Sequence, residues 1–136
     1  MLLKTEEHRI RMADVDAARV IYYASPYLWR EALFTGWLYE VGHPLSEMLD
    51  SGAGCPCVSS SAEYLRPMRL DDIVRLELRS GRVGTSSFDI GMDVYDSGGA
   101  VSARVETTNV WVANSGNDVE AQPLPVWLRG LLTEEA

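Results

Sequence analysis

One stretch of the sequence decides the fold, residues 25–42, which read SPYLWREALFTGWLYEVG. Ser25 favours the N-cap of a helix, Pro26 suits the first helical position, and Gly42 suits the residue that follows the last turn. Between these signals, apolar side chains occupy most of the helix circumference, which is typical of a helix enclosed on nearly all sides. The stretch therefore predicts a long helix over residues 25–41 with a sheet wrapped around it.

The sheet is predicted by segments in which apolar and polar residues alternate, as they do on strands with one buried face. The turn-forming sequence DSGG at residues 96–99 separates two of these segments and indicates a meander. The fold class is therefore α+β, with an antiparallel sheet. We expect strands over residues 8–12, 57–65, 74–79, 88–94 and 101–112, and short helices over residues 45–49 and 126–132.

Length and composition narrow the class of protein. The chain has 136 residues, 46% hydrophobic and 24% charged, which predicts one globular domain over residues 1–136. A net charge of −8 opposes binding to nucleic acid. No apolar run of about 18 residues is present to span a membrane, and the polar start lacks the apolar core of a secretion signal. Cys55 and Cys57 are expected to be reduced thiols, which predicts a cytoplasmic protein.

Two carboxylates precede the helix in the segment DVDAARVIYYA, residues 14–24. A helix start exposes unpaired N–H donors that can hold the oxyanion formed when a carbonyl is attacked. A carboxylate beside it could attack the carbon or activate water. Asp14 and Asp16 can equally be capping or turn residues, so the residues alone leave both interpretations open.

The same segment, continued by YLWRE at residues 27–31, resembles the signature of hot-dog-fold acyl-CoA thioesterases of the 4-hydroxybenzoyl-CoA thioesterase type, including the YbgC-like branch. Residues 54–67, the LDDIV of residues 70–74 and the GTS of residues 84–86 resemble later strands and turns of that family. The resemblance covers most of residues 8–112. It implies a hot-dog fold, an antiparallel sheet wrapped around a long central helix. It also implies homodimers or homotetramers (dimers of dimers), with active sites at the subunit interface.

The resemblance also assigns site residues. Asp16 takes the place of the catalytic carboxylate, as nucleophile or as general base toward water. Tyr23 takes the place of the residue whose backbone N–H binds the thioester oxygen at the helix start. Glu31 matches an acidic helix position that helps to recognise the acyl group, and it can equally be a structural carboxylate.

Two arginines bear on the substrate. Arg19 stands where the family usually has glycine, so either the loop is rebuilt or Arg19 points into the cleft to meet an anion or pair with Asp14 or Asp16. Arg82 is our candidate for binding the coenzyme A phosphates, with a solvated charge as the alternative. His8 and His43 lie outside the motif and are expected to be structural.

The sequence thus predicts a thioester hydrolase that cleaves an acyl-CoA, or an acyl group on a carrier protein, without a metal or bound cofactor. The main alternative is a non-catalytic acyl-CoA-binding or scaffold protein in which Arg19 favours ligand retention. A hot-dog dehydratase is a further alternative, although such an enzyme is expected to carry a histidine near the helix start, where this chain has Tyr23.

Overall fold

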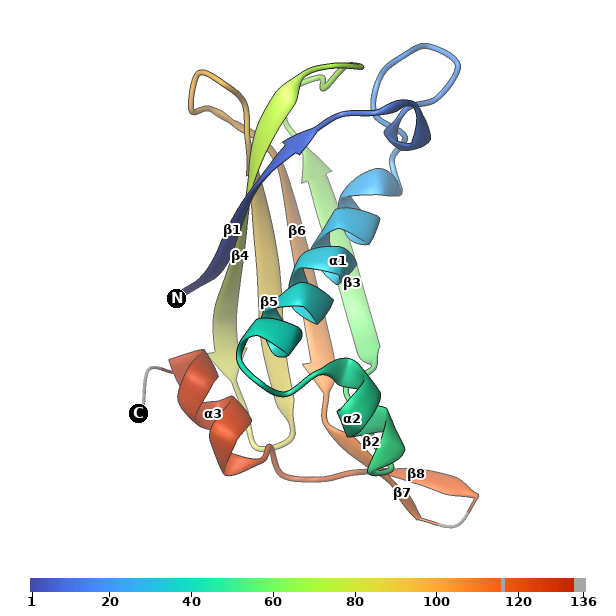
Figure 1. Cartoon of the computed structure of the whole chain (residues 1–136), viewed down its shortest axis with the longest axis vertical. Coiled ribbons are helices and arrows are strands. Elements are labelled where there is room, and N and C mark those ends of the chain that lie inside the picture. Colours follow the sequence, from blue (N-terminus) through green and yellow to red (C-terminus); the bar gives the residue numbers. More distant parts are fainter. Residues whose placement is uncertain (116, 134–136) are drawn as a thin grey trace.

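The computed structural model describes residues 1–115 and 117–133, and it contains one long helix laid across one face of an antiparallel sheet (Figure 1). The five-stranded sheet has the order β1-β4-β5-β6-β3, and a smaller sheet has the order β2-β7-β8. Within the described residues, no helix is long and apolar enough to cross a membrane. The elements are β1 (Leu2–Arg9), the 3-10 helix η1 (Met12–Asp14), α1 (Ser25–Glu40), α2 (Leu45–Asp50), β2 (Ala53–Gly54), β3 (Cys57–Tyr64), β4 (Ile73–Val83), β5 (Ser87–Tyr95), β6 (Val101–Val110), β7 (Val112–Ser115), β8 (Asp118–Ala121) and α3 (Val126–Thr133).

The core lies between α1 and the inner face of the three central strands. The residues expected to alternate on β4 and β5 are buried as predicted, because every second side chain of a strand points to the same face. Gly42 ends the long helix with φ at +88°, as the sequence predicted. The side chains that meet in this layer include Trp29, Leu33, Phe34, Trp37 and Leu38 from α1 and Val74, Leu76, Leu78, Phe88, Ile90, Met92 and Val94 from the sheet.

The first strand differs from the prediction. It was expected over residues 8–12, but β1 runs over Leu2–Arg9, and Met12 lies in η1. β1 is an edge strand beside β4, and none of its residues is buried, so its sequence has little apolar alternation for a pattern to detect. Lys4 covers Gly36 of α1 with its aliphatic stem and forms an ion pair with Glu40.

The strand expected over residues 101–112 is also divided. β6 ends at Val110, and Val112 begins β7, which belongs to the smaller sheet. Trp111 lies between them, where its N–H donates to Ser86 O and its carbonyl accepts from Gln122 N–H. The chain therefore passes from one sheet to the other at Trp111. The sequence pattern around this residue looks like that of one continuous strand.

Helix α1 is less enclosed than the sequence suggested. Within this chain the sheet covers one side of it, and Leu28 and Tyr39 remain 66% and 74% exposed. The start of the helix also differs: α1 begins at Ser25 after Ala24 as N-cap, and the Ser25 hydroxyl donates to Asp14 O (2.8 Å) instead of capping the helix.

One buried carboxylate joins β1, the loop after it and α1. Asp14 Oδ2 accepts from the Arg11 N–H (2.9 Å) and from His8 Nε2 (2.9 Å), and its Oδ1 accepts from Trp29 Nε1 (3.0 Å). Burial by itself would raise the pKa of this carboxyl, but the hydrogen bonds from Arg11, Trp29 and His8 together lower it below the ordinary value. His8 also packs its ring on Trp29, with centroids 4.7 Å apart, so the expectation of a structural role for His8 is confirmed.

We expect Asp14→Asn to reduce the free energy of unfolding at neutral pH by about 1–3 kcal/mol, because it removes an acceptor from buried donors. Since the pKa of Asp14 is lower in the folded protein than in the unfolded chain, this contribution is present in full above the unfolded value of about 3.9. It is lost as the pH falls through the folded pKa.

Urea unfolding of both proteins at pH 7 and at several values below pH 4 measures this difference. Asp16→Asn is the matched control, because it removes an exposed carboxylate two residues away and should change stability little. A difference between wild type and Asp14→Asn that is constant down to the lowest pH would contradict the assignment.

Candidate active site

The motif segment forms a small hairpin between η1 and α1. Val15 and Ile21 pair as an isolated antiparallel bridge, and the Asp16 N–H donates to Val20 O (3.0 Å). The Arg19 N–H donates to Asp16 O (3.0 Å), which closes the turn at the tip. Hydrogen bonds from Ile21 N–H to Met68 O (2.9 Å) and from Leu70 N–H to Arg19 O (3.1 Å) fix the hairpin to the segment before β4.

Asp16 presents an accessible carboxylate on this hairpin. Its Oδ1 accepts the Ala18 N–H (2.8 Å), which orients the side chain within the turn, and the residue is exposed. In the described part of the chain it forms no ion pair. The two acids of the motif are therefore distinct: Asp14 is buried with both oxygens bonded, whereas Asp16 is free to act on a ligand.

Arg19 keeps the backbone conformation that a glycine would adopt at this place, with φ at +64°. Its side chain is exposed, and among the described residues it pairs with neither Asp14 nor Asp16. Of the alternatives that the sequence left open, the ion pair with a neighbouring acid is therefore wrong.

Tyr23 stands just before α1 with a free backbone donor. Its carbonyl accepts the hydroxyl hydrogen of Tyr64, at the end of β3, while its N–H has no acceptor among the described residues. The neighbouring Tyr22 N–H is bound to Asp14 O (2.8 Å), so the backbone around Tyr23 is fixed. A depression of about 330 Å³ opens beside it, lined by Ile21, Tyr23, Tyr64, Leu65, Arg66 and Pro67.

Glu31 lies on the rim of a larger depression, of about 520 Å³, between α1, α2 and the start of β3. It is exposed, and its Oε1 accepts from Thr35 Oγ1 (2.6 Å) one turn further along the helix. Apolar side chains make up most of this lining, including Phe34, Leu45, Leu49, Ala53, Val112 and Val119, and its buried polar members are Arg30 and Asn109.

Arg82 is not brought to the helix start within one chain. Ile73, at the beginning of β4, pairs with Arg9 just before the motif segment, and Arg82 lies at the other end of that strand, roughly 30 Å away at about 3.3 Å per residue. Figure 1 shows this end of the sheet beside α3, opposite to the start of α1. Arg82 donates to Ser87 Oγ (3.0 Å) and lies 3.6 Å from Asp89 Oδ1.

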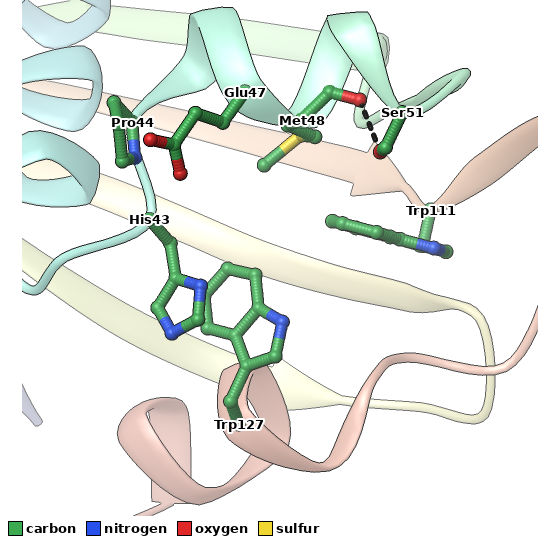
Figure 2. A pocket seen from close by; sticks show the side chains of 7 residues that line it. All are labelled: His43, Pro44, Glu47, Met48, Ser51, Trp111 and Trp127. Atoms are coloured by element: carbon green, nitrogen blue, oxygen red, sulfur yellow. Dashed lines mark hydrogen bonds between the residues drawn. The ribbon is translucent and has the colours of Figure 1, made fainter.

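A third depression, of about 230 Å³, lies away from the motif (Figure 2). The His43 ring stacks on Trp127 with centroids 3.6 Å apart, and Trp111 meets Trp127 edge-on at 6.1 Å. These contacts dock α3 against the turn between α1 and α2, in agreement with the structural role expected for His43. No group of three His, Cys, Asp or Glu side chains within the described residues could hold a metal ion.

Sequence reasoning missed two contributors to these surfaces. Tyr64 lies within residues 54–67, for which the sequence predicts only a strand, and its hydroxyl fixes the carbonyl of Tyr23. Arg30, which lies within the quoted YLWRE but has no role assigned from the sequence, is buried in the wall of the larger depression. The aromatic residue three positions before Pro67 was a usable signal for the first, whereas a charged residue beside Glu31 gave no signal for the second.

The chain is similar in sequence to proteins of known activity. The family model described as "Thioesterase-like superfamily" matches residues 10–132. A 1,4-dihydroxy-2-naphthoyl-CoA hydrolase from Thermosynechococcus vestitus is 25% identical over 93% of this chain and 89% of its own.

Two solved structures share the fold. A 1,4-dihydroxy-2-naphthoyl-CoA thioesterase from Synechocystis superposes with a TM-score of 0.85 at 21% identity, covering 94% of this chain and 93% of its own. A gentisyl-coenzyme A thioesterase superposes with a TM-score of 0.81 at 25% identity, covering 93% of this chain and 99% of its own. The expected hot-dog fold class is thereby confirmed.

We expect Arg19→Gly to stabilise the protein by about 0.5–1 kcal/mol. The left-handed conformation costs a residue with a Cβ about 1–2 kcal/mol, and the greater conformational entropy of glycine in the unfolded chain offsets part of the gain. Thermal unfolding measures the change, and Arg19→Ala, which keeps the backbone strain and removes the charge, is the control. An equal gain in both variants would mean that the charge of Arg19, not its backbone, sets the stability.

Proposed function

Because the chain belongs to the thioesterase-like superfamily, we propose that it hydrolyses the thioester of an acyl-CoA to a free acid and coenzyme A. The names of its relatives support coenzyme A as the thiol, since both the hydrolase and the gentisyl thioesterase are named for CoA thioesters. An acyl group on a carrier protein is the alternative substrate. The protein works as a hydrolase without a bound cofactor.

The observation that carries this proposal is that one fixed loop holds both an accessible carboxylate and a backbone N–H that has no acceptor among the described residues. Asp16 is exposed and unpaired within the described residues, and Tyr23 has an N–H without an acceptor among them. The backbone between them is tied to Asp14 O and to the segment before β4. A preorganised N–H donor such as that of Tyr23 stabilises a developing oxyanion without reorganisation during the reaction.

In the proposed reaction the carbonyl oxygen of the thioester accepts the Tyr23 N–H, and the positive end of α1 adds to the attraction. Asp16 either takes a proton from water, whose oxygen bonds to the carbonyl carbon, or bonds to that carbon itself. The carbon–sulfur bond then breaks, and the thiolate leaves and takes up a proton. In the second route, water cleaves the acyl-aspartate to the acid.

Glu31, Arg19 and Arg82 have separate proposed parts in substrate binding. Glu31 lies on the rim of the depression that would take the acyl group. Arg19, exposed on the hairpin, is available to an anionic group of the substrate. Since Arg82 is far from the helix start of its own chain, it could contact the coenzyme A phosphates only at a site completed by another chain.

We propose that the chain works as a homodimer, or as a tetramer of two dimers. β3 is an edge strand, and all but one of its residues are exposed, Val58 by 61%. An uncovered edge offers unpaired backbone groups to a second copy. The exposed apolar side chains Leu28 and Tyr39 of α1 support a partner on the same side as the open depressions.

A reducing cytoplasm is the proposed location, supported by the free thiols of Cys55 and Cys57.

We expect Asp16→Asn to lower kcat at least ~100-fold, by analogy with the loss of a general base, while the affinity for the thioester is kept. Release of free thiol from a panel of aliphatic and aromatic acyl-CoAs measures it. Asp50→Asn, which removes an exposed carboxylate of α2, is the control and should keep wild-type activity. Full activity of Asp16→Asn would refute the role of this acid, and absence of turnover by the wild type on every substrate would favour an acyl-CoA-binding protein.

We expect Ser60→Glu to weaken self-association roughly tenfold, because an antiparallel copy of β3 would place the two new carboxylates close together near the middle of the strand. Sedimentation velocity over a range of concentrations measures the dissociation constant. Ser97→Glu adds the same charge in the turn between β5 and β6 and should leave association unchanged. A wild-type protein that sediments as a monomer would contradict the proposed dimer.

A further inference from the structure

Arg30 is a cation buried within the chain. Arg30 belongs to α1 and is only 6% exposed. Its side chain lines the depression on whose rim Glu31 lies. Among the described residues no carboxylate forms an ion pair with it. The contrast with Arg79 is sharp, since that guanidinium is bound by both Asp93 and Glu106.

The guanidinium of Arg30 is nevertheless held in place. Its Nη2 donates to Asn109 Oδ1 (2.6 Å), and Asn109 in turn donates from Nδ2 to Cys55 O (2.9 Å). The Arg30 Cζ atom lies over the Phe34 ring, 4.8 Å from its centroid. The Nε atom is buried and has no acceptor among the described residues. Arg30 is thus a fixed donor with unused hydrogen-bonding capacity.

This arrangement is unfavourable for the unliganded chain. Burial lowers the pKa of Arg30 from its ordinary value, while Cys57, Cys55 and Glu31 act in the opposite direction. A guanidinium does not lose its proton in proteins, so it stays charged and its burial is not relieved by neutralisation. A buried charge without a partner is strongly destabilising, and a fixed, unpaired donor in a pocket wall is what a ligand of opposite charge would satisfy.

We propose that Arg30 binds a carboxylate at the far end of the acyl group, so that the depression selects acyl chains that end in a carboxylate over uncharged chains of the same shape. This inference rests on the proposed thioesterase function. The planar fork of a guanidinium fits the two oxygens of a carboxylate, and the apolar side chains around Arg30 fit the body of the acyl group. Glu31, the carboxylate in this lining, is exposed and bound to Thr35, so water screens its repulsion of a second anion.

The test compares two thioesters of equal shape, 4-carboxybenzoyl-CoA and 4-methylbenzoyl-CoA. We expect the wild type to prefer the first by at least about tenfold in kcat/KM, and Arg30→Met to lose that preference. Arg30→Lys, which keeps the charge without the planar fork, should keep part of it. Arg104→Met, which removes a half-exposed arginine of β6 near Asp93, is the matched control and should keep all of it. A wild type that favours the methyl compound, or an Arg30→Met enzyme that keeps the preference, would overturn the proposal.

Binding gives a readout that does not depend on turnover. In an Asp16→Asn background, isothermal titration should show tighter binding of the carboxyl compound by roughly tenfold or more, and Arg30→Met should remove this difference. Arg30→Met should melt at the same temperature as the parent protein or higher in the absence of ligand. A lower melting temperature and weaker self-association, with unchanged selectivity, would mean instead that Arg30 pairs with a carboxylate of a second copy.

The two proposals fail in different ways. Equal hydrolysis of both thioesters would refute the selection by Arg30 and leave the thioesterase function intact. Selective binding of the carboxyl compound without release of thiol would refute the hydrolase and leave the role of Arg30 intact.

Discussion

The carboxylate of Asp14 is the constraint on which the rest of the site depends. Its side chain joins three parts of the chain, because it binds His8 of β1, the Arg11 N–H of the loop and Trp29 of α1. Its backbone carbonyl accepts two more hydrogen bonds, from the Tyr22 N–H and the Ser25 hydroxyl, at the start of the helix. With every oxygen engaged, Asp14 cannot act on a substrate. Asp14 holds both ends of the loop that carries Asp16. The two acids of this short motif therefore differ: Asp14 stabilises the fold of the loop, and Asp16 is exposed to solvent.

The same junction fixes the backbone at the start of α1, where we place the proposed oxyanion site. Tyr23 lies directly after the residue whose N–H binds Asp14 O, and its own carbonyl is fixed by the Tyr64 hydroxyl from the end of β3. These two bonds restrict the peptide units on either side of the one that carries the Tyr23 N–H, and this N–H has no acceptor among the described residues. Because Pro26 has no N–H, Tyr23 and its neighbour Ala24 carry the accessible donors at this end of α1. The positive end of the helix therefore acts through donors whose direction is set before any ligand arrives.

How much of this the sequence could predict depends on where each residue finds its partners. The central strands were predicted because Val74, Leu76 and Phe88 meet a core within the same chain, and Gly42 was predicted because its positive φ is a local requirement. The position of β1 was not predicted, since none of its residues is buried and its sequence therefore carries no apolar alternation. In the site, the resemblance selected Asp16, but only the coordinates separated its role from that of Asp14. The burial of Arg30 could not be predicted from the sequence, because a charged residue in a helix is expected to face solvent.

Arg19 and Arg30 have a feature in common that links stability to function. Arg19 holds a left-handed backbone that a glycine would adopt without strain, and Arg30 keeps a buried charge that no carboxylate among the described residues balances. Neither arrangement improves the folding of the chain, whereas Arg79 shows that the same sheet can surround a guanidinium with two carboxylates. Both residues lie in or directly after the segment that carries Asp16 and Tyr23, at a loop and a depression open to ligands. Unfavourable local energies are retained in proteins where binding or catalysis offsets them. Both costs fall within or soon after the motif segment in the sequence, which supports our proposal that an anionic substrate, rather than the fold, accounts for these two arginines.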